Sequence, residues 1–155
     1  MIRILKALLL FVSGLLLLAL ATDAQSYRLS FDVASIQLSA DQSVGHVGTI
    51  YTIPGGRFTA NSVLLRVLIF NAYDLKEPEQ LIGGPDWMNT IRWNIEAQAA
   101  GNPDRDTVMR MLRALLEDRF KLKVHRETRE LSKLESAKGP VEVLVIDSVQ
   151  KPSEN

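Results

Sequence analysis

Apolar residues recur along the chain with two different spacings, which predict strands and helices in alternation. Where every second residue is apolar, the pattern is typical of a strand with one buried face. This spacing predicts strands at Tyr27–Leu38, on both sides of the turn Pro54-Gly55-Gly56, and at Gln80–Ile82, Arg92–Ala99, Phe120–Leu131 and Val141–Val149. The last of these is apolar on both faces in its middle, so we expect it in the centre of a sheet. It follows Phe120–Leu131 closely in sequence, so we expect the two strands to form a hairpin.

The same alternation predicts which side chains of two strands are buried. In Tyr27–Leu38 the apolar side holds Leu29, Phe31 and Val33. In Arg92–Ala99 the apolar side holds Trp93, Ile95 and Ala97, so Arg92 is expected on the solvated side.

Two segments have apolar residues at helical spacing. The first begins after Asn61, a good N-cap residue, and its apolar positions are Leu64, Leu65, Leu68, Ile69 and Ala72. The second follows the break Gly101-Asn102-Pro103 with Asp104 or Asp106 as its cap, and its buried positions are Val108, Met111, Leu112 and Leu115. Ser132 and Glu135 have the spacing of a capping box for one helical turn in the following linker. The order of elements predicts an α+β fold, a mainly antiparallel sheet with two helices packed on one face.

Residues 1–24 have the three parts of a secretory signal peptide. Arg3 and Lys6 make the start positive, residues 7–21 are uncharged and apolar, and small or polar residues follow up to Ala24. Residues 25–155 are then a single domain, exported to the periplasm or beyond the cell. A retained membrane anchor is the alternative, although the apolar run is shorter than the roughly 20 residues that span a bilayer.

Composition and charge exclude several classes of protein. Apolar residues make up 46% of the chain and charged residues 23%, as in ordinary globular domains. Lys+Arg and Asp+Glu number 18 each, and this balance argues against nucleic acid as a partner. The chain has no cysteine, which excludes disulfides, thiolate catalysis and cysteine-ligated metals.

Candidate chemical sites are few. The nucleophile elbow, the phosphate loop and the zinc-hydrolase helix each have a sequence signature, and none of the three occurs. His46 and His125 could bind a metal with Asp41 or Glu127, but their spacing does not support such a site. We therefore predict no catalytic residue, no metal and no cofactor.

The stretch from Arg119 to Leu131 is the most charged part of the chain. Phe120, Leu122 and Val124 alternate with charged residues, as expected for a strand with one solvated face. We predict a candidate interaction face on this strand, made by Lys121, Lys123, His125 and Arg129. The alternative is that these side chains are only solvated.

Several motifs together resemble a known family. "FDVASIQLS", "GGRFTANSVLLRVLIFNAYDL", "QLIGGPDWMNTIRWNIEAQA", "MLRALLEDRFKLKVHRETREL" and "KGPVEVLVIDSVQKPSEN" are similar to the soil-associated protein family of acidobacterial genomes. The resemblance implies an exported domain of unknown function, with related domains attached to antirepressor-type metallopeptidase sensors. The family offers no catalytic residues to carry over. In similar members a long second half separates "RETREL" from "KGPVEVLVID", whereas "SKLESAKGP" joins them here, so this chain resembles an internally shortened member.

These observations predict a non-enzymatic binding or sensing module outside the cytoplasm. Its partner is an unidentified extracytoplasmic protein or ligand, and it meets a membrane only through an uncleaved leader. Two alternatives stay open: an extracytoplasmic hydrolase with an unrecognised site, and a degenerate shortened paralogue.

Overall fold

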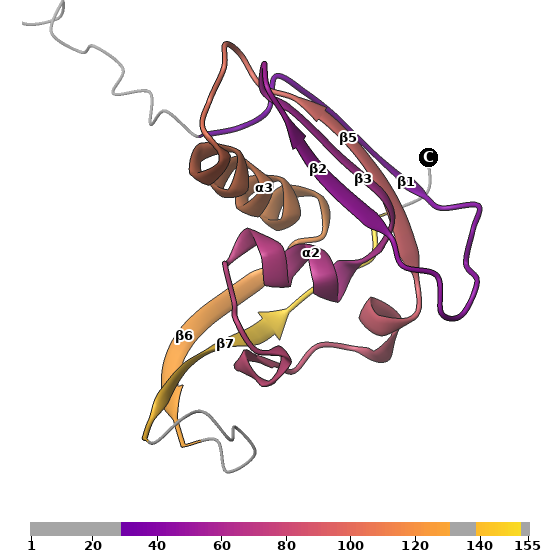
Figure 1. Ribbon diagram of the computed structural model, residues 1–155. Coiled ribbons are helices and arrows are strands. Elements are labelled where there is room, and N and C mark those ends of the chain that lie inside the picture. The colour runs from indigo at the N-terminus through magenta and orange to yellow at the C-terminus, as the bar shows by residue number, and fades with distance from the viewer. Residues whose placement is uncertain (1–28, 131–138, 153–155) are drawn as a thin grey trace, which may run out of the picture.

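Two β-sheets and two α-helices make up residues 29–130 and 139–152, the part of the chain that the computed structural model describes (Figure 1). The elements in chain order, with short 3-10 helices labelled η, are β1 (Val33–Leu38), β2 (Thr49–Ile53), β3 (Arg57–Leu64), α2 (Leu65–Ala72), η1 (Pro78–Gln80), β4 (Leu81–Ile82), η2 (Asp86–Asn89), β5 (Arg92–Gln98), α3 (Arg105–Arg119), β6 (Lys123–Arg129) and β7 (Val141–Ser148). The predicted leader and the predicted helical turn at Ser132 and Glu135 lie outside the described residues. The expected α+β class is confirmed.

The larger sheet, sheet A, is antiparallel and has the order β1-β5-β3-β2. The expected pair of strands around Pro54-Gly55-Gly56 is the β2–β3 hairpin. Figure 1 shows α2 and α3 on one side of sheet A. The strand faces toward the helices carry buried Phe58, Ala60 and Ile95, so this side of sheet A is one wall of the core.

The smaller sheet, sheet B, has the order β4-β7-β6. Its strand β7 lies in the centre, parallel to β4 and antiparallel to β6, which confirms both the central position and the hairpin expected for the last strand. The strands therefore divide between two sheets, where the sequence pattern suggested one. Figure 1 shows α2 between sheet A and the β6–β7 hairpin. The α2 side chains Leu65, Leu68, Ile69 and Ala72 are buried and belong to the same core cluster as residues of both sheets, which is consistent with the many apolar positions of this helix.

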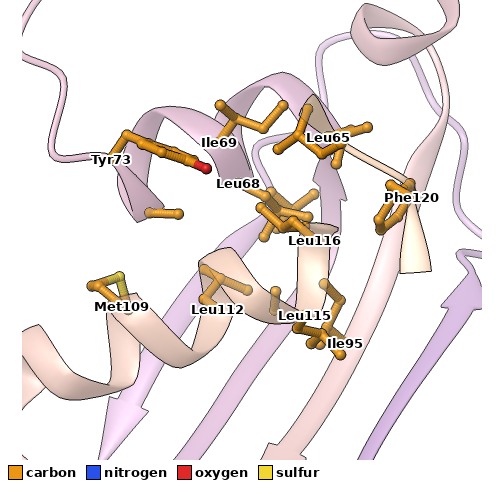
Figure 2. Close-up of a cluster of buried hydrophobic side chains, with 14 of the residues drawn as sticks. Leu65, Leu68, Ile69, Tyr73, Ile95, Met109, Leu112, Leu115, Leu116 and Phe120 are labelled. Atoms are coloured by element: carbon orange, nitrogen blue, oxygen red, sulfur yellow. The ribbon is translucent and has the colours of Figure 1, made fainter. Parts of the chain in front are cut away.

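The core forms where the two helices meet the sheets (Figure 2). Figure 2 draws buried side chains of this cluster. Those that are fully buried include Leu65, Leu68, Ile69, Ile95, Leu112, Leu116 and Phe120. Trp93 packs edge-on against Phe120 with ring centroids 5.2 Å apart. The predicted buried stripe of α3 is confirmed, and that of α2 is confirmed at Leu65, Leu68, Ile69 and Ala72. The predicted position Leu64 is instead the half-buried last residue of β3.

The two helices begin differently. The cap expected for α3 is confirmed, because the Thr107 backbone N–H donates to the Asp104 carboxylate over 2.7 Å. The cap expected at Asn61 is wrong, because Asn61 lies within β3 and α2 begins only after Leu64, which makes no side-chain cap. Asn61 pairs with Thr49 of β2, and after a bulge between Ala60 and Val63 the ladder with β5 resumes as far as Leu64, so the strand continues past Asn61.

The predicted first strand is also shorter than expected. The strand β1 begins at Val33, after a bend at Asp32. This bend changes the phase of the alternation: Phe31 packs against Phe58 with centroids 6.1 Å apart, while Val33 is 68% exposed. Ala34 is among the residues that pack on the core instead.

Candidate interaction surface

The loop between β1 and β2, residues 39–48, extends away from the two helices in Figure 1. We call it the tip loop. Its base is attached to β5 by Gln42, whose side chain pairs with the main chain of Arg92. The Arg92 N–H donates to Gln42 Oε1 over 2.9 Å, and Gln42 Nε2 donates to the carbonyls of Arg92 (3.1 Å) and Ser39 (2.7 Å). The Gln42 side-chain amide thus makes the two hydrogen bonds with the Arg92 main chain that a neighbouring strand would otherwise make.

A second attachment is buried beneath the tip loop. Ser62, at the bulge in β3, donates its hydroxyl to the carbonyl of Asp41 (2.8 Å) and receives the Arg92 guanidinium on its own carbonyl (3.0 Å). Its N–H donates to Asn94 Oδ1 over 2.8 Å. Arg92 is therefore buried, and the expectation that it lies on the solvated side is wrong. Its guanidinium donates to the Ser62 carbonyl, which the bulge leaves without a partner in the neighbouring strand.

The tip loop also holds a serine, a histidine and an aspartate close together. The Asp41 carboxylate accepts from the N–H (2.9 Å) and the hydroxyl (2.5 Å) of Ser43, and it lies 3.1 Å from His46 Nδ1. These hydrogen bonds from Ser43, with a smaller contribution from His46, hold the pKa of Asp41 below its ordinary value. The serine hydroxyl donates to the carboxylate and not to the imidazole, so the group closes a turn and does not set up a serine nucleophile.

The structure exposes seven large apolar side chains among the described residues, and six of them lie between positions 33 and 56. They are Val33, Leu38, Val44, Val47, Tyr51 and Ile53. Val44 is fully exposed and Val47 is 84% exposed, both on the anchored tip loop. Single exposed apolar residues are ordinary, but Val44 and Val47 lie close together in sequence on one loop, which makes the tip loop a candidate contact surface.

The same segment is unusually poor in charge. Asp41 is the one Asp, Glu, Lys or Arg between Val33 and Gly56, in a chain with 23% charged residues. We call residues 33–56 the charge-poor segment. It contains β1, the tip loop and β2, and the order of sheet A places β1 and β2 at its two edges. Depletion of charge together with exposed apolar side chains is the composition found at the centre of protein interfaces. The sequence analysis missed this site, although the missing charges were visible in the sequence.

The four residues of the predicted interaction face are placed in three different ways. Lys121 is not in the strand: β6 begins at Lys123, and Lys121 has a φ of 49° and lies 3.8 Å from Asp118. Lys123 begins β6 and is exposed. Only His125 and Arg129 come together, and both do so through Glu127.

The outer side of β6 is therefore balanced in charge around His125. Its Nδ1 lies 2.8 Å from Asp147 of β7, and its Nε2 lies 3.6 Å from Glu127. Arg129 also pairs with Glu127. Because acidic groups accompany the basic ones, the face has no basic excess at this point. Its role in binding stays a prediction.

The two histidines considered above as metal ligands, His46 and His125, lie on different parts of the fold. His46 is in the tip loop beside Asp41, and His125 is in sheet B beside Glu127 and Asp147. Within residues 29–130 and 139–152, no three His, Asp or Glu side chains form a group suited to a metal ion. No helix in these ranges is long and apolar enough to cross a bilayer.

An open hollow of about 580 Å³ runs along α3, between Arg110, Arg113, Glu117 and Lys121. Arg113 is committed to the fold: its Nε donates to the Ala72 carbonyl over 2.6 Å, and its guanidinium stacks 4.8 Å from the Tyr73 ring. Burial, and then the charge of Glu117, raise the pKa of Tyr73. These contacts tie the end of α2 to α3.

Comparison with known proteins finds similarity in one part of the chain. The family model described as "Protein of unknown function (DUF3738)" matches residues 66–133, which run from α2 through β6. A domain of unknown function is thus indicated there. No curated protein and no solved structure matches the chain. The match leaves out the charge-poor segment and ends within the linker "SKLESAKGP".

Proposed function

We propose that the protein is a non-enzymatic binding module that works outside the cytoplasm, with the tip loop as its main contact surface. The observation that carries the proposal is the exposure of Val44 and Val47 on a loop whose base is held by buried hydrogen bonds. A loop anchored in this way has lost most of its conformational freedom before binding, so its partner does not have to supply that free energy. Binding would also remove the apolar side chains of Val44 and Val47 from water, which lowers the free energy of the complex.

Export is supported by the leader pattern of residues 1–24. We further propose that the chain is an internally shortened relative of the soil-associated family of acidobacterial type. The indicated domain of unknown function is compatible with this assignment. The hydrolase and the degenerate paralogue are the competing proposals, and a binding experiment separates both from a binding module.

The experiment is a pull-down from the envelope fraction of the native cell with purified exported protein. The test variant carries Val44→Lys and Val47→Lys, which place charge on the exposed tip without touching the anchors. The matched control carries Lys121→Gln and Lys123→Gln on the predicted basic face. We expect the tip variant to lose the captured partner and the control to retain it, with circular dichroism showing that both are folded.

Two other results would count against the proposal. Capture of the same partner by wild type and tip variant would remove the tip loop as the contact surface. Loss of the partner only in the Lys121→Gln, Lys123→Gln variant would move the site to the outer side of β6.

A further inference from the structure

The short edge strand β2 lacks three of the usual protections of a sheet edge, namely charge, proline and a bulge. It pairs with β3 on one side, and no strand among the described residues pairs with its other side. Natural edge strands are commonly blunted by charge, proline or a bulge, since their free N–H and C=O groups can pair with another chain. The five residues of β2, TIYTI, contain none of these, and the bulge in this sheet lies in β3. Tyr51 and Ile53 are 55% and 41% exposed beside this edge.

We propose that β2 pairs with β2 of a second copy of the chain, antiparallel and centred on Tyr51. The pairing joins two four-stranded sheets into one continuous sheet. This inference goes beyond the proposed function, because it concerns self-association and not the partner of the tip loop.

The register follows from geometry. Antiparallel residues that lie opposite each other point to the same face, so a twofold axis must lie midway between the two copies of one residue. Tyr51 is the central residue of β2, and placing the axis there pairs all five residues of the strand. With the axis at Tyr51, each Thr49 lies opposite Ile53 of the second copy, and each Ile50 lies opposite Thr52. The two Tyr51 side chains face each other on the outer side of the sheet, where aromatic cross-strand pairs are favourable.

The lack of charge is compatible with a second copy as the occupant and disfavours a charged peptide. A twofold axis at the centre of a strand brings the central side chain against itself, so a charge there would be repelled by its own copy. From Gln42 to Gly56 the chain has no Asp, Glu, Lys or Arg. A strand that recruited a different, charged peptide would gain from a complementary charge, and β2 offers none.

The other edge strand of sheet A, β1 (VASIQL), also lacks charge and proline, but it has Ser35 where β2 has the aromatic Tyr51, so it serves as the control. Ser35 of β1 lies opposite Glu96, which lies opposite Thr59, which lies opposite Tyr51. Ser35 and Tyr51 therefore occupy the same row of the outer face at opposite edges, and both are exposed. A substitution at Ser35 tests for effects of charge or thiol at a sheet edge in general.

The chain has no cysteine, so single cysteines report on contact without background. Tyr51→Cys should form an intermolecular disulfide under mild oxidation, because opposite residues of paired strands have Cβ atoms within about 1 Å of the roughly 3.5–4.5 Å that a disulfide spans. Ser35→Cys should remain monomeric in the same conditions. Absence of the cross-link at position 51, or equal cross-linking at both positions, would overturn the proposal.

Sedimentation equilibrium of the purified exported protein gives the second measurement. We expect wild type to dimerise reversibly and Ser35→Lys to dimerise as wild type does. Tyr51→Lys should weaken dimerisation by about tenfold or more, from like charges placed opposite each other and the lost aromatic contact. Circular dichroism checks that each variant is folded. A wild type that is monomeric at every concentration, or a Tyr51→Lys variant that dimerises unchanged, would refute the pairing.

Discussion

Gly48, at the junction of the tip loop and β2, offers a test of how the candidate surface is attached. A Cβ at this position would lie 2.4 Å from the carbonyl oxygen of Ser62 and 2.8 Å from that of Asn61. Both atoms belong to the backbone of β3, which cannot rotate away as a flexible side chain can. Ser62 itself is held by Asn94 and Arg92. The Gly48→Ala substitution should therefore push β2 and the tip loop away from the bulge.

The sign of the effect is the informative quantity. The φ of Gly48 is outside the left-handed region, so alanine is not strained by the backbone conformation itself. At an open site, Gly→Ala would stabilise the protein by about 0.4–1 kcal/mol, because the unfolded chain loses freedom. Overpacking against fixed atoms costs about 1–3 kcal/mol. We expect the overpacking to dominate, because the three nearest contacts of the added Cβ, all with backbone atoms, fall below 3.0 Å, and the substitution should destabilise the protein.

The assay is urea unfolding, combined with hydrogen exchange of the Ser62 amide, which donates to Asn94. Gly48→Ala should lower the free energy of unfolding and accelerate this exchange. Gly45→Ala is the control, since Gly45 has a φ of +85° and no neighbour within 4 Å of its added Cβ. It should cost roughly 1–2 kcal/mol from its left-handed backbone and leave exchange at Ser62 protected by its local hydrogen bond. A Gly48→Ala protein as stable as wild type, or more stable, would refute the close approach.

Three further predictions concern the core, a helix cap and the leader. Leu112→Ala, at a fully buried position of α3, should lower the free energy of unfolding by about 2–5 kcal/mol. The control Val67→Ala, at a position 41% exposed, should lower it by no more than about 0.5 kcal/mol. Equal losses in urea unfolding would contradict the assignment of the buried stripe. Hydrogen bonds from Thr107 hold the pKa of Asp104 below its ordinary value of 3.8, so its stabilising contribution is complete above that value and is lost as the pH falls through the lower folded-state pKa. The stability difference between wild type and Asp104→Ala should thus disappear in strong acid, and a difference that persists there would argue against an ionic cap. N-terminal sequencing of exported protein should begin between Thr22 and Gln25, and a start at Met1 in the membrane fraction would show a retained anchor.

Elements whose partners are close in sequence could be predicted from the sequence alone. The helix α3 has a strong apolar repeat and a capping aspartate, so its bounds and its buried side chains follow from local rules. The strand β5 and the β6–β7 hairpin follow from period-two alternation and a short connection. The sequence also shows that positions 42–56 have no charged residue, but only the structure shows that several apolar residues of this segment are exposed.

Elements shaped by distant pairing could be decided only by the tertiary structure. Asn61 has the local properties of a helix cap, but it pairs with Thr49 of β2, and the ladder between β3 and β5 resumes beyond it, so it lies in a strand. The alternation of β5 predicts Arg92 on the solvated side, yet its guanidinium is buried because it hydrogen-bonds the Ser62 carbonyl at the β3 bulge. The charges around His125 balance only because β7 brings Asp147 alongside β6. In each case, a hydrogen bond or ion pair between residues far apart in sequence outweighs a local preference worth about 1 kcal/mol or less.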